Sequence, residues 1–114
     1  MCIKYMELSD IVEINKQFDT GTMINSASLD FAVSSIKRKG SWLEQLAFLV
    51  RALLVDHPFK DGNKRTTTAL VLVYFDENNI QFDKDKTIRT MIKISAETPT
   101  DTRKIEKELK RCMI

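Results

Sequence analysis

The chain has 114 residues, of which 43% are hydrophobic and 30% charged, with only three glycines and two prolines. These values exclude a disordered or fibrous chain and favour one compact, helix-rich domain spanning residues 1–114. The formal net charge is +2, from 18 Lys and Arg against 16 Asp and Glu, and the cations are scattered along the chain, so nucleic acid is not an expected partner.

Two amphipathic helices are predicted in the first third of the chain. The first covers residues 8–18, with Ser9 as its candidate N-cap and the "DTG" at 19–21 as its end. Its apolar positions, three and four residues apart, are Ile11, Ile14 and Phe18. The second follows a Ser-rich start and ends by Gly40. Its apolar positions are Leu29, Ala32, Val33 and Ile36.

The next two helices are predicted to run through the core. The stretch 41–57 begins with Ser41 and Glu44 in capping-box spacing and is then apolar on nearly every face. The stretch 63–79 is apolar on most faces from Ala69 to Phe75. Its β-branched residues could suggest a strand, but its length and flanks favour a helix.

Two further helices complete an all-α bundle of about six helices. One covers residues 85–95, with Ile88, Met91 and Ile92 on one face, and the other covers 101–114. The apolar positions of the last helix are Ile105, Leu109 and Met113.

The ends of the chain indicate the compartment. Cys2 and Cys112 lie near opposite ends without CxxC spacing, so neither a disulfide framework nor a zinc site is expected. The N-terminus lacks a long apolar segment, and no apolar run reaches membrane-spanning length before a charge interrupts it. A soluble, cytoplasmic protein without a membrane partner is therefore expected.

The stretch "HPFKDGNKRT" at 57–66 concentrates polar chemistry between the two central helices. A helix that starts near Gly62 or Asn63 presents unpaired N–H groups at the positive end of its dipole, where Lys64 and Arg65 add charge, so an anion such as a phosphate is expected to bind. A carboxylate beside phosphates, here Asp61, is a usual ligand of Mg²⁺. His57 is suited to take a proton from a hydroxyl nucleophile.

Each of these residues also has an ordinary structural interpretation. A single histidine is often a surface or capping residue, an aspartate before Gly-Asn is a common turn former, and a Lys-Arg pair is often only solvated. Together they are harder to explain in this way, because Lys64 and Arg65 at a helix N-terminus oppose the dipole unless an anion binds there. Phe59 is interpreted as a core anchor of the loop and Pro58 as a rigid turn element.

At these residues the sequence resembles the Fic/Doc (Fido) family, whose signature is H-x-F-x-[D/E]-G-N-[G/K]-R. The positions are filled by His57, Phe59, Asp61, Gly62, Asn63, Lys64 and Arg65. The resemblance implies the small all-helical Fic/Doc fold and a transferase that uses Mg-ATP to modify a hydroxyl side chain of a target protein.

The resemblance also implies a role for each residue of the motif. His57, Lys64 and Arg65 are the implied catalytic residues, with His57 as the base, and Asp61 is the implied Mg²⁺ ligand. The implied nucleotide-binding residues are Gly62, Asn63, Lys64 and Arg65. For Asn63 an N-cap role is an equally good alternative.

Two positions favour the Doc (death-on-curing) branch of the family. Adenylylating members usually read G-N-G-R-x-x-R, whereas this chain has Lys64 and, at the position of the last Arg, Thr68. The Doc branch implies a toxin kinase that transfers the γ-phosphate to a threonine of elongation factor Tu and is neutralised by an antitoxin protein in trans. The alternatives are AMP transfer by a Fic-type adenylyltransferase and a non-catalytic regulatory binding module.

Two other segments are compared with family features. Members often bind the target peptide along a short β-like flap, for which Ser34–Gly40 is a candidate although it lacks an alternating pattern and is equally consistent with a solvated loop. The segment Thr102–Lys107 partly matches the inhibitory pattern [S/T]-x-x-x-E-[G/N], and is interpreted instead as a solvated helix face.

Overall fold

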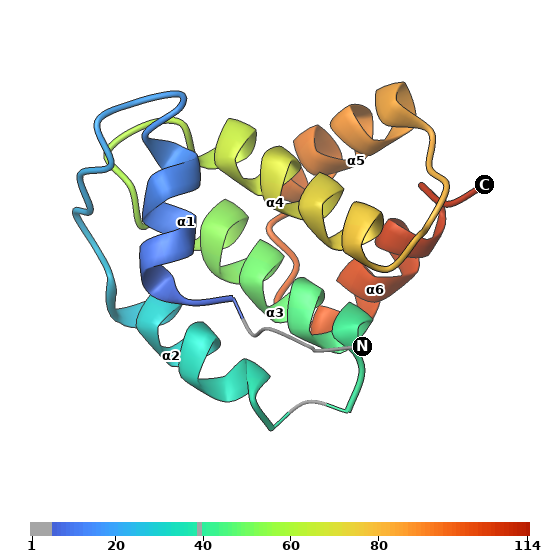
Figure 1. The fold of residues 1–114 in the computed structure, drawn as a ribbon, viewed down its shortest axis with the longest axis horizontal. Helices are drawn as coiled ribbons and strands as arrows, with labels where there is room; N and C mark the ends of the chain where they lie inside the picture. The colour runs from blue at the N-terminus through green and yellow to red at the C-terminus, as the bar shows by residue number, and fades with distance from the viewer. Residues whose placement is uncertain (1–5, 39) are drawn as a thin grey trace.

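The structure is a computed structural model that describes residues 6–38 and 40–114, so Cys2 and Lys39 lie outside the described residues. Within this part of the chain the fold is all-α, as the sequence predicts, and six helices follow one another (Figure 1). They are α1 (Leu8–Asn15), α2 (Ala27–Ile36), α3 (Trp42–Val55), α4 (Asn63–Glu77), α5 (Lys84–Glu97) and α6 (Thr102–Lys110).

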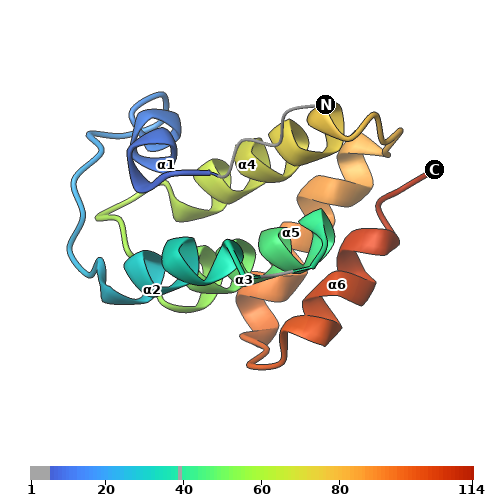
Figure 2. The ribbon, with the colours of Figure 1, turned by 60° about the horizontal axis from the view of Figure 1, so that its bottom comes forward.

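Helices α3 and α4 lie side by side in the middle of the molecule (Figures 1 and 2). Helix α1 packs on α4 and α2 packs on α3 at one end, while α5 and α6 close the other end. The largest fully buried side chains include Phe59, Phe75 and Met91 as well as leucines of α3 and α4. The prediction that these two helices form the core is confirmed, as is the helical state of the β-branched stretch in α4.

The starts of the first and third helices differ in how well the sequence predicted them. Ser41 caps α3 by accepting a hydrogen bond from the N–H of Glu44 at 3.1 Å, as predicted. Ser9 is not the N-cap of α1, because the helix already begins at Leu8 and Glu7 is its N-cap. The N–H of Glu7 donates to the carboxylate of Asp10 at 2.9 Å, and this acidic pair replaces the Ser-based cap.

The apolar face predicted for the fifth helix is partly wrong. Ile88 and Ile92 are 39% and 55% exposed, whereas the threonines at 87 and 90 are buried beside Met91. The threonine hydroxyls can be buried because they donate to carbonyls one turn earlier, at 2.8 and 2.7 Å, so their polar groups are satisfied inside the helix. A buried helix face that contains such threonines does not show the apolar spacing from which a buried face is predicted.

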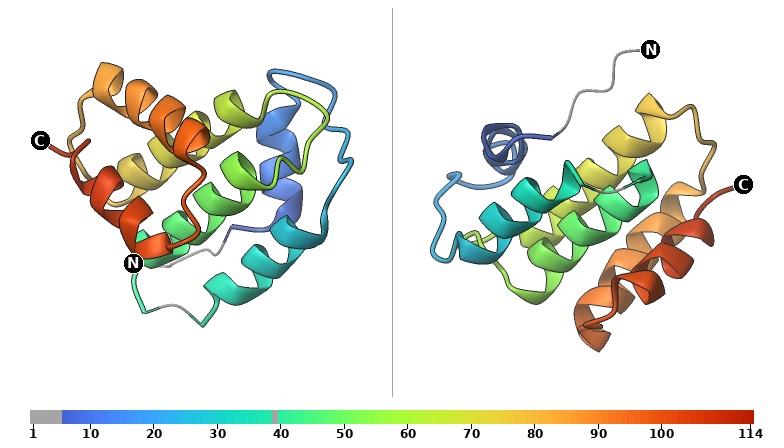
Figure 3. Two further views of the ribbon diagram at one scale, coloured as in Figure 1. Left: turned by 180° about the vertical axis from the view of Figure 1, so that it is seen from behind. Right: turned by 90° about the horizontal axis from the view of Figure 1, so that it is seen from below.

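The two segments compared with family features lie in helices. Ser34–Ile36 completes α2, so the predicted flap over Ser34–Gly40 is wrong for these residues. Thr102–Lys107 lies in α6, on the opposite side of the molecule from the loop between α3 and α4 (Figures 1 and 3).

Among the described residues, no helix combines the length and apolar character that crossing a membrane requires.

Candidate active site

His57 begins the loop that joins α3 to α4, at the end of the molecule where α1 lies (Figure 3). It follows the C-cap Asp56 and has a φ of 46°, in the left-handed region where a helix commonly terminates. Its side chain is exposed, and the next two residues, Pro58 and Phe59, are buried. The end of α3 therefore leaves the imidazole exposed to solvent, while the next two residues enter the core.

Phe59 attaches this loop to the core, as predicted, with a side chain that is 1% exposed. The amide of Asn63 stabilises the same turn twice, because its Oδ1 accepts from the N–H of Phe59 at 3.1 Å and its Nδ2 donates to the Phe59 carbonyl at 3.0 Å. Gly62, not Asn63, is the N-cap of α4. With its side chain engaged in this way, Asn63 offers a ligand its backbone N–H.

The N-terminus of α4 has the features of an anion site. Gly62 has a φ of 76°, which favours glycine, and no side chain caps the helix. The first backbone bond of the helix comes from the N–H of Thr66, so the N–H groups of residues 63–65 have no acceptor among the described residues. Lys64 and Arg65 are exposed there and form no ion pair with any described residue. Unpaired cations beside free N–H groups create a local excess of positive charge.

The Asp61 carboxylate is suited to bind an Mg²⁺ ion that is also bound by phosphate. Its carboxylate is exposed, has no ion pair with a described residue and accepts one hydrogen bond, from the N–H of Gly62 at 2.7 Å. The described residues contain no group of three or more His, Cys, Asp or Glu placed to bind a metal ion. One carboxylate beside an anion site suits a cation that takes its other ligands from phosphate oxygens and water.

A cavity of about 360 Å³ brings all the predicted site residues together. This volume lies within the range of small-molecule sites, about 300–1,000 Å³. It is lined by Phe18, His57, Asp61, Gly62, Asn63, Lys64 and Arg65. Phe18 was predicted to lie on the buried face of the first helix, but the helix ends at Asn15 and the ring is 38% exposed at this cavity.

Asn15 is a site residue that the sequence analysis missed. It is fully buried at the end of α1, and its side chain bonds to the Asp61 carbonyl, the Thr66 hydroxyl and the Gly21 N–H. No sequence signal identified it, because an asparagine near the end of an amphipathic helix is normally solvated or capping.

A second missed feature is the segment Thr22–Asn25, which pairs with the motif loop. The N–H of Ile24 donates to the Pro58 carbonyl at 2.8 Å, and the N–H of Lys60 donates to the Thr22 carbonyl at 2.9 Å. Met23 faces Phe59 in an antiparallel bridge. A short β-like segment therefore lies beside the motif, upstream of α2 rather than at its end.

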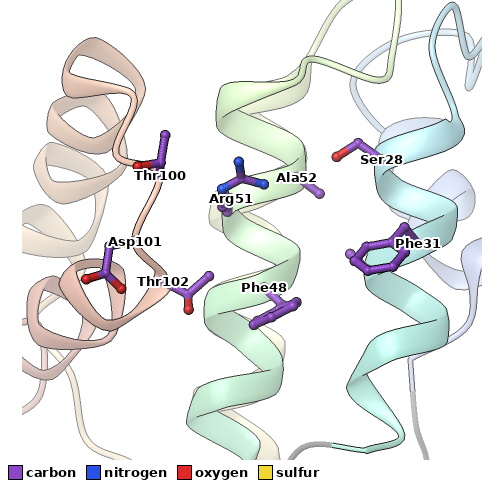
Figure 4. Close-up of a pocket in the computed structure, with 9 residues that line it drawn as sticks. Ser28, Phe31, Phe48, Arg51, Ala52, Thr100, Asp101 and Thr102 are labelled. Atoms are coloured by element: carbon purple, nitrogen blue, oxygen red, sulfur yellow. The ribbon is translucent and has the colours of Figure 1, made fainter.

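Another cavity, of about 240 Å³, lies between α2, α3 and the turn into α6 (Figure 4). Arg51, Phe31 and Phe48 line it, with Ser28 and Asp101 at its edges. It contains neither the histidine nor the Lys64–Arg65 pair. The loop between α3 and α4 is therefore the better candidate for chemistry.

The fold and this site define a class: a small helical domain whose two central helices are joined by a loop that places a histidine and an acid beside an anion-binding helix start. A family model described as the Fic/DOC family matches residues 15–75, more than half of the 114 residues. The chain belongs to the Fic/DOC family. No curated protein matches the chain. Members of the family are typically transferases that move AMP or a phosphoryl group to a protein hydroxyl, generally with ATP and Mg²⁺.

Proposed function

We propose that this chain is a Doc-like protein kinase toxin, which transfers the γ-phosphoryl group of ATP to a threonine of elongation factor Tu. The observation that carries the proposal is the state of Thr68, which replaces the second Arg of adenylylating members. Its hydroxyl donates to the Lys64 carbonyl at 2.9 Å, so it is bonded to its own helix and supplies no cation to the cavity. The positive charge of the helix start comes instead from Lys64 and Arg65.

In this proposal His57 takes the proton of the acceptor hydroxyl while the oxygen bonds to the γ-phosphorus and the bond to the β-phosphate oxygen breaks. The products are the phosphorylated side chain and ADP. The N–H groups at the start of α4, with Lys64 and Arg65, stabilise negative charge on the phosphoryl oxygens. Asp61 would bind Mg²⁺, which when present neutralises phosphate charge.

The target segment is proposed to lie along Thr22–Asn25. Three backbone groups of this segment bond to the motif loop: the Thr22 carbonyl accepts from the Lys60 N–H, and the N–H groups of Ile24 and Asn25 both donate to the Pro58 carbonyl. Met23 faces Phe59 in a bridge whose hydrogen bonds are made by the flanking residues, so the backbone groups of Met23 point away from the loop and are suited to pair with a peptide. A peptide added there places an acceptor side chain beside the loop that carries His57.

Control is proposed to come from an antitoxin protein in trans. The segment Thr102–Lys107, which partly matches the pattern of an inhibitory helix, lies in α6 away from the motif loop (Figure 1). A separate protein that covers the cavity would block nucleotide and target together.

The proposal is tested by incubating the protein with purified elongation factor Tu and Mg-ATP labelled on either the α- or the γ-phosphate. Transfer of the γ-label alone, with a mass increase of one phosphoryl group, supports it, and His57→Ala is the matched control. Transfer of the α-label establishes AMP transfer and refutes the role given to Thr68. No transfer to this or any extract protein, with Mg-ATP still bound, identifies a non-catalytic binding module.

A further inference from the structure

Asn15 is fully buried, and all the polar groups of its side chain have partners in the candidate site. Its Nδ2 donates to the Asp61 carbonyl at 3.0 Å and to the Thr66 hydroxyl at 3.0 Å, and its Oδ1 accepts from the Gly21 N–H at 2.9 Å. The Asp61 carbonyl needs a donor and the Gly21 N–H needs an acceptor, so only this orientation of the amide satisfies both. A buried amide with every group paired is energetically favourable and fixed in place.

These partners belong to separate parts of the site. Asp61 lies in the motif loop, Thr66 lies in the first turn of α4, and Gly21 directly precedes the β-like segment 22–25. One side chain at the end of α1 therefore connects the loop, the anion-binding helix and the segment that pairs with the loop.

We infer that Asn15 is a positioning residue for the anion-binding backbone, an inference that rests on the proposed use of this site for Mg-ATP. The peptide between Asp61 and Gly62 is planar and trans, so its carbonyl and N–H point in opposite directions. Asn15 binds the carbonyl toward the interior, which turns the Gly62 N–H outward, where Asp61 Oδ1 now accepts it at 2.7 Å. Without Asn15 this peptide is free to rotate. The Gly62 N–H would then no longer point outward, and a phosphate could not accept a hydrogen bond from it.

The close packing at Gly62 agrees with this role. A Cβ added there would lie 3.2 Å from Asn15 Nδ2 and 3.6 Å from the Cβ atoms of Phe18 and Asp19. The end of α1 therefore contacts the backbone of the anion site directly. Together with its φ of 76°, this tight contact favours glycine at position 62.

The test compares Asn15→Ala with Thr66→Val, a matched control of nearly unchanged shape. Asn15→Ala removes three buried or partly buried hydrogen bonds, whereas Thr66→Val removes only the one between Asn15 and Thr66 and keeps the bond from Asn15 to the Asp61 carbonyl. The readouts are the ¹H–¹⁵N signal and hydrogen exchange of the Gly62 amide, and the Kd for Mg-ATP by calorimetry. If loss of the shared bond between Asn15 and Thr66 accounted for the effect, both variants would behave alike.

Asn15→Ala is expected to shift the Gly62 signal, to speed its exchange, and to weaken Mg-ATP binding on the order of tenfold, whereas Thr66→Val stays within about twofold. Equal effects of the two variants, or an unchanged Gly62 signal in Asn15→Ala, overturn the inference. If the wild-type protein does not bind Mg-ATP, the proposed function fails, and the Gly62 signals still decide the role of Asn15.

If Asn15→Ala does not fold, the wild-type protein supplies a second measurement. The side-chain NH₂ protons of Asn15 are expected to shift when Mg-ATP is added, while those of Asn78 do not. Asn78 is a suitable control, since its Nδ2 donates to the Tyr74 carbonyl at 2.8 Å at the far end of α4. No shift at Asn15 under saturating Mg-ATP overturns the inference.

Discussion

Replacing His57 by Gly and by Ala separates the catalytic role proposed for this residue from the effect of its backbone conformation. The φ of 46° places this residue in the left-handed region, which costs an L-residue about 1–2 kcal/mol. Glycine avoids that penalty but loses about 0.5–1 kcal/mol more backbone entropy on folding. The difference predicts that the free energy of unfolding of His57→Gly exceeds that of His57→Ala by roughly 0.5–1 kcal/mol.

The difference in stability reports the backbone conformation alone, because the exposed His57 side chain forms no hydrogen bond or ion pair with a described residue. Urea unfolding followed by far-UV circular dichroism measures the two free energies, and the transfer assay is run on the same samples. We expect both variants to lose transfer and the Gly variant to be at least as stable as wild type. An Ala variant as stable as the Gly variant would refute backbone strain at position 57. A Gly variant that retains transfer would refute His57 as the base.

Three further predictions concern other parts of the same site and core. Phe59→Ala is expected to lower the free energy of unfolding by about 3–5 kcal/mol in thermal or urea unfolding, because its ring is 1% exposed, and Phe59→Leu should cost less. Burial, and secondarily the charge of Glu77, raises the pKa of Tyr74 to about 12. The folded state then retains a proton that the unfolded state loses from about pH 10 upward. The free energy of unfolding should therefore fall as the pH rises from about 10 toward 12. Tyr74→Phe should abolish this loss in unfolding curves recorded across that range. Asp61→Asn should leave unfolding unchanged while weakening the Mg²⁺ dependence of ATP binding in calorimetry; an unaltered Mg²⁺ dependence would exclude Asp61 as the ligand.

The fold was predictable where burial follows apolar spacing. Helix α3 and the stretch of α4 from Ala69 to Phe75 are so apolar that they have few alternatives to the centre of the bundle. Prediction failed where polar residues are buried, as at Thr87 and Thr90 of α5. Their hydroxyls bond to carbonyls of their own helix, a compensation that no hydropathy pattern records.

The site was predictable where its residues are consecutive. A stretch of nine residues, 57–65, carries the histidine, the acid, the glycine and both cations, and the structure places them around one cavity. Asn15 and the segment Thr22–Asn25 reach this loop only through the tertiary fold, across more than 30 residues of sequence. A single sequence contains no sign of such pairing, because neither an asparagine nor a short segment of mixed polarity is unusual on a surface.

The polar residues of the site fall into two groups with different physical roles. The first group has its side-chain groups satisfied within the protein: Asn15, Asn63, Thr66, Thr67 and Thr68. The second group is exposed and has no ion pair with a described residue: His57, Asp61, Lys64 and Arg65. Residues of the second group contribute little to the free energy of folding, since water already solvates them. Their concentration around one cavity is therefore not explained by stability, and a ligand that carries both negative charge and a transferable group explains it best.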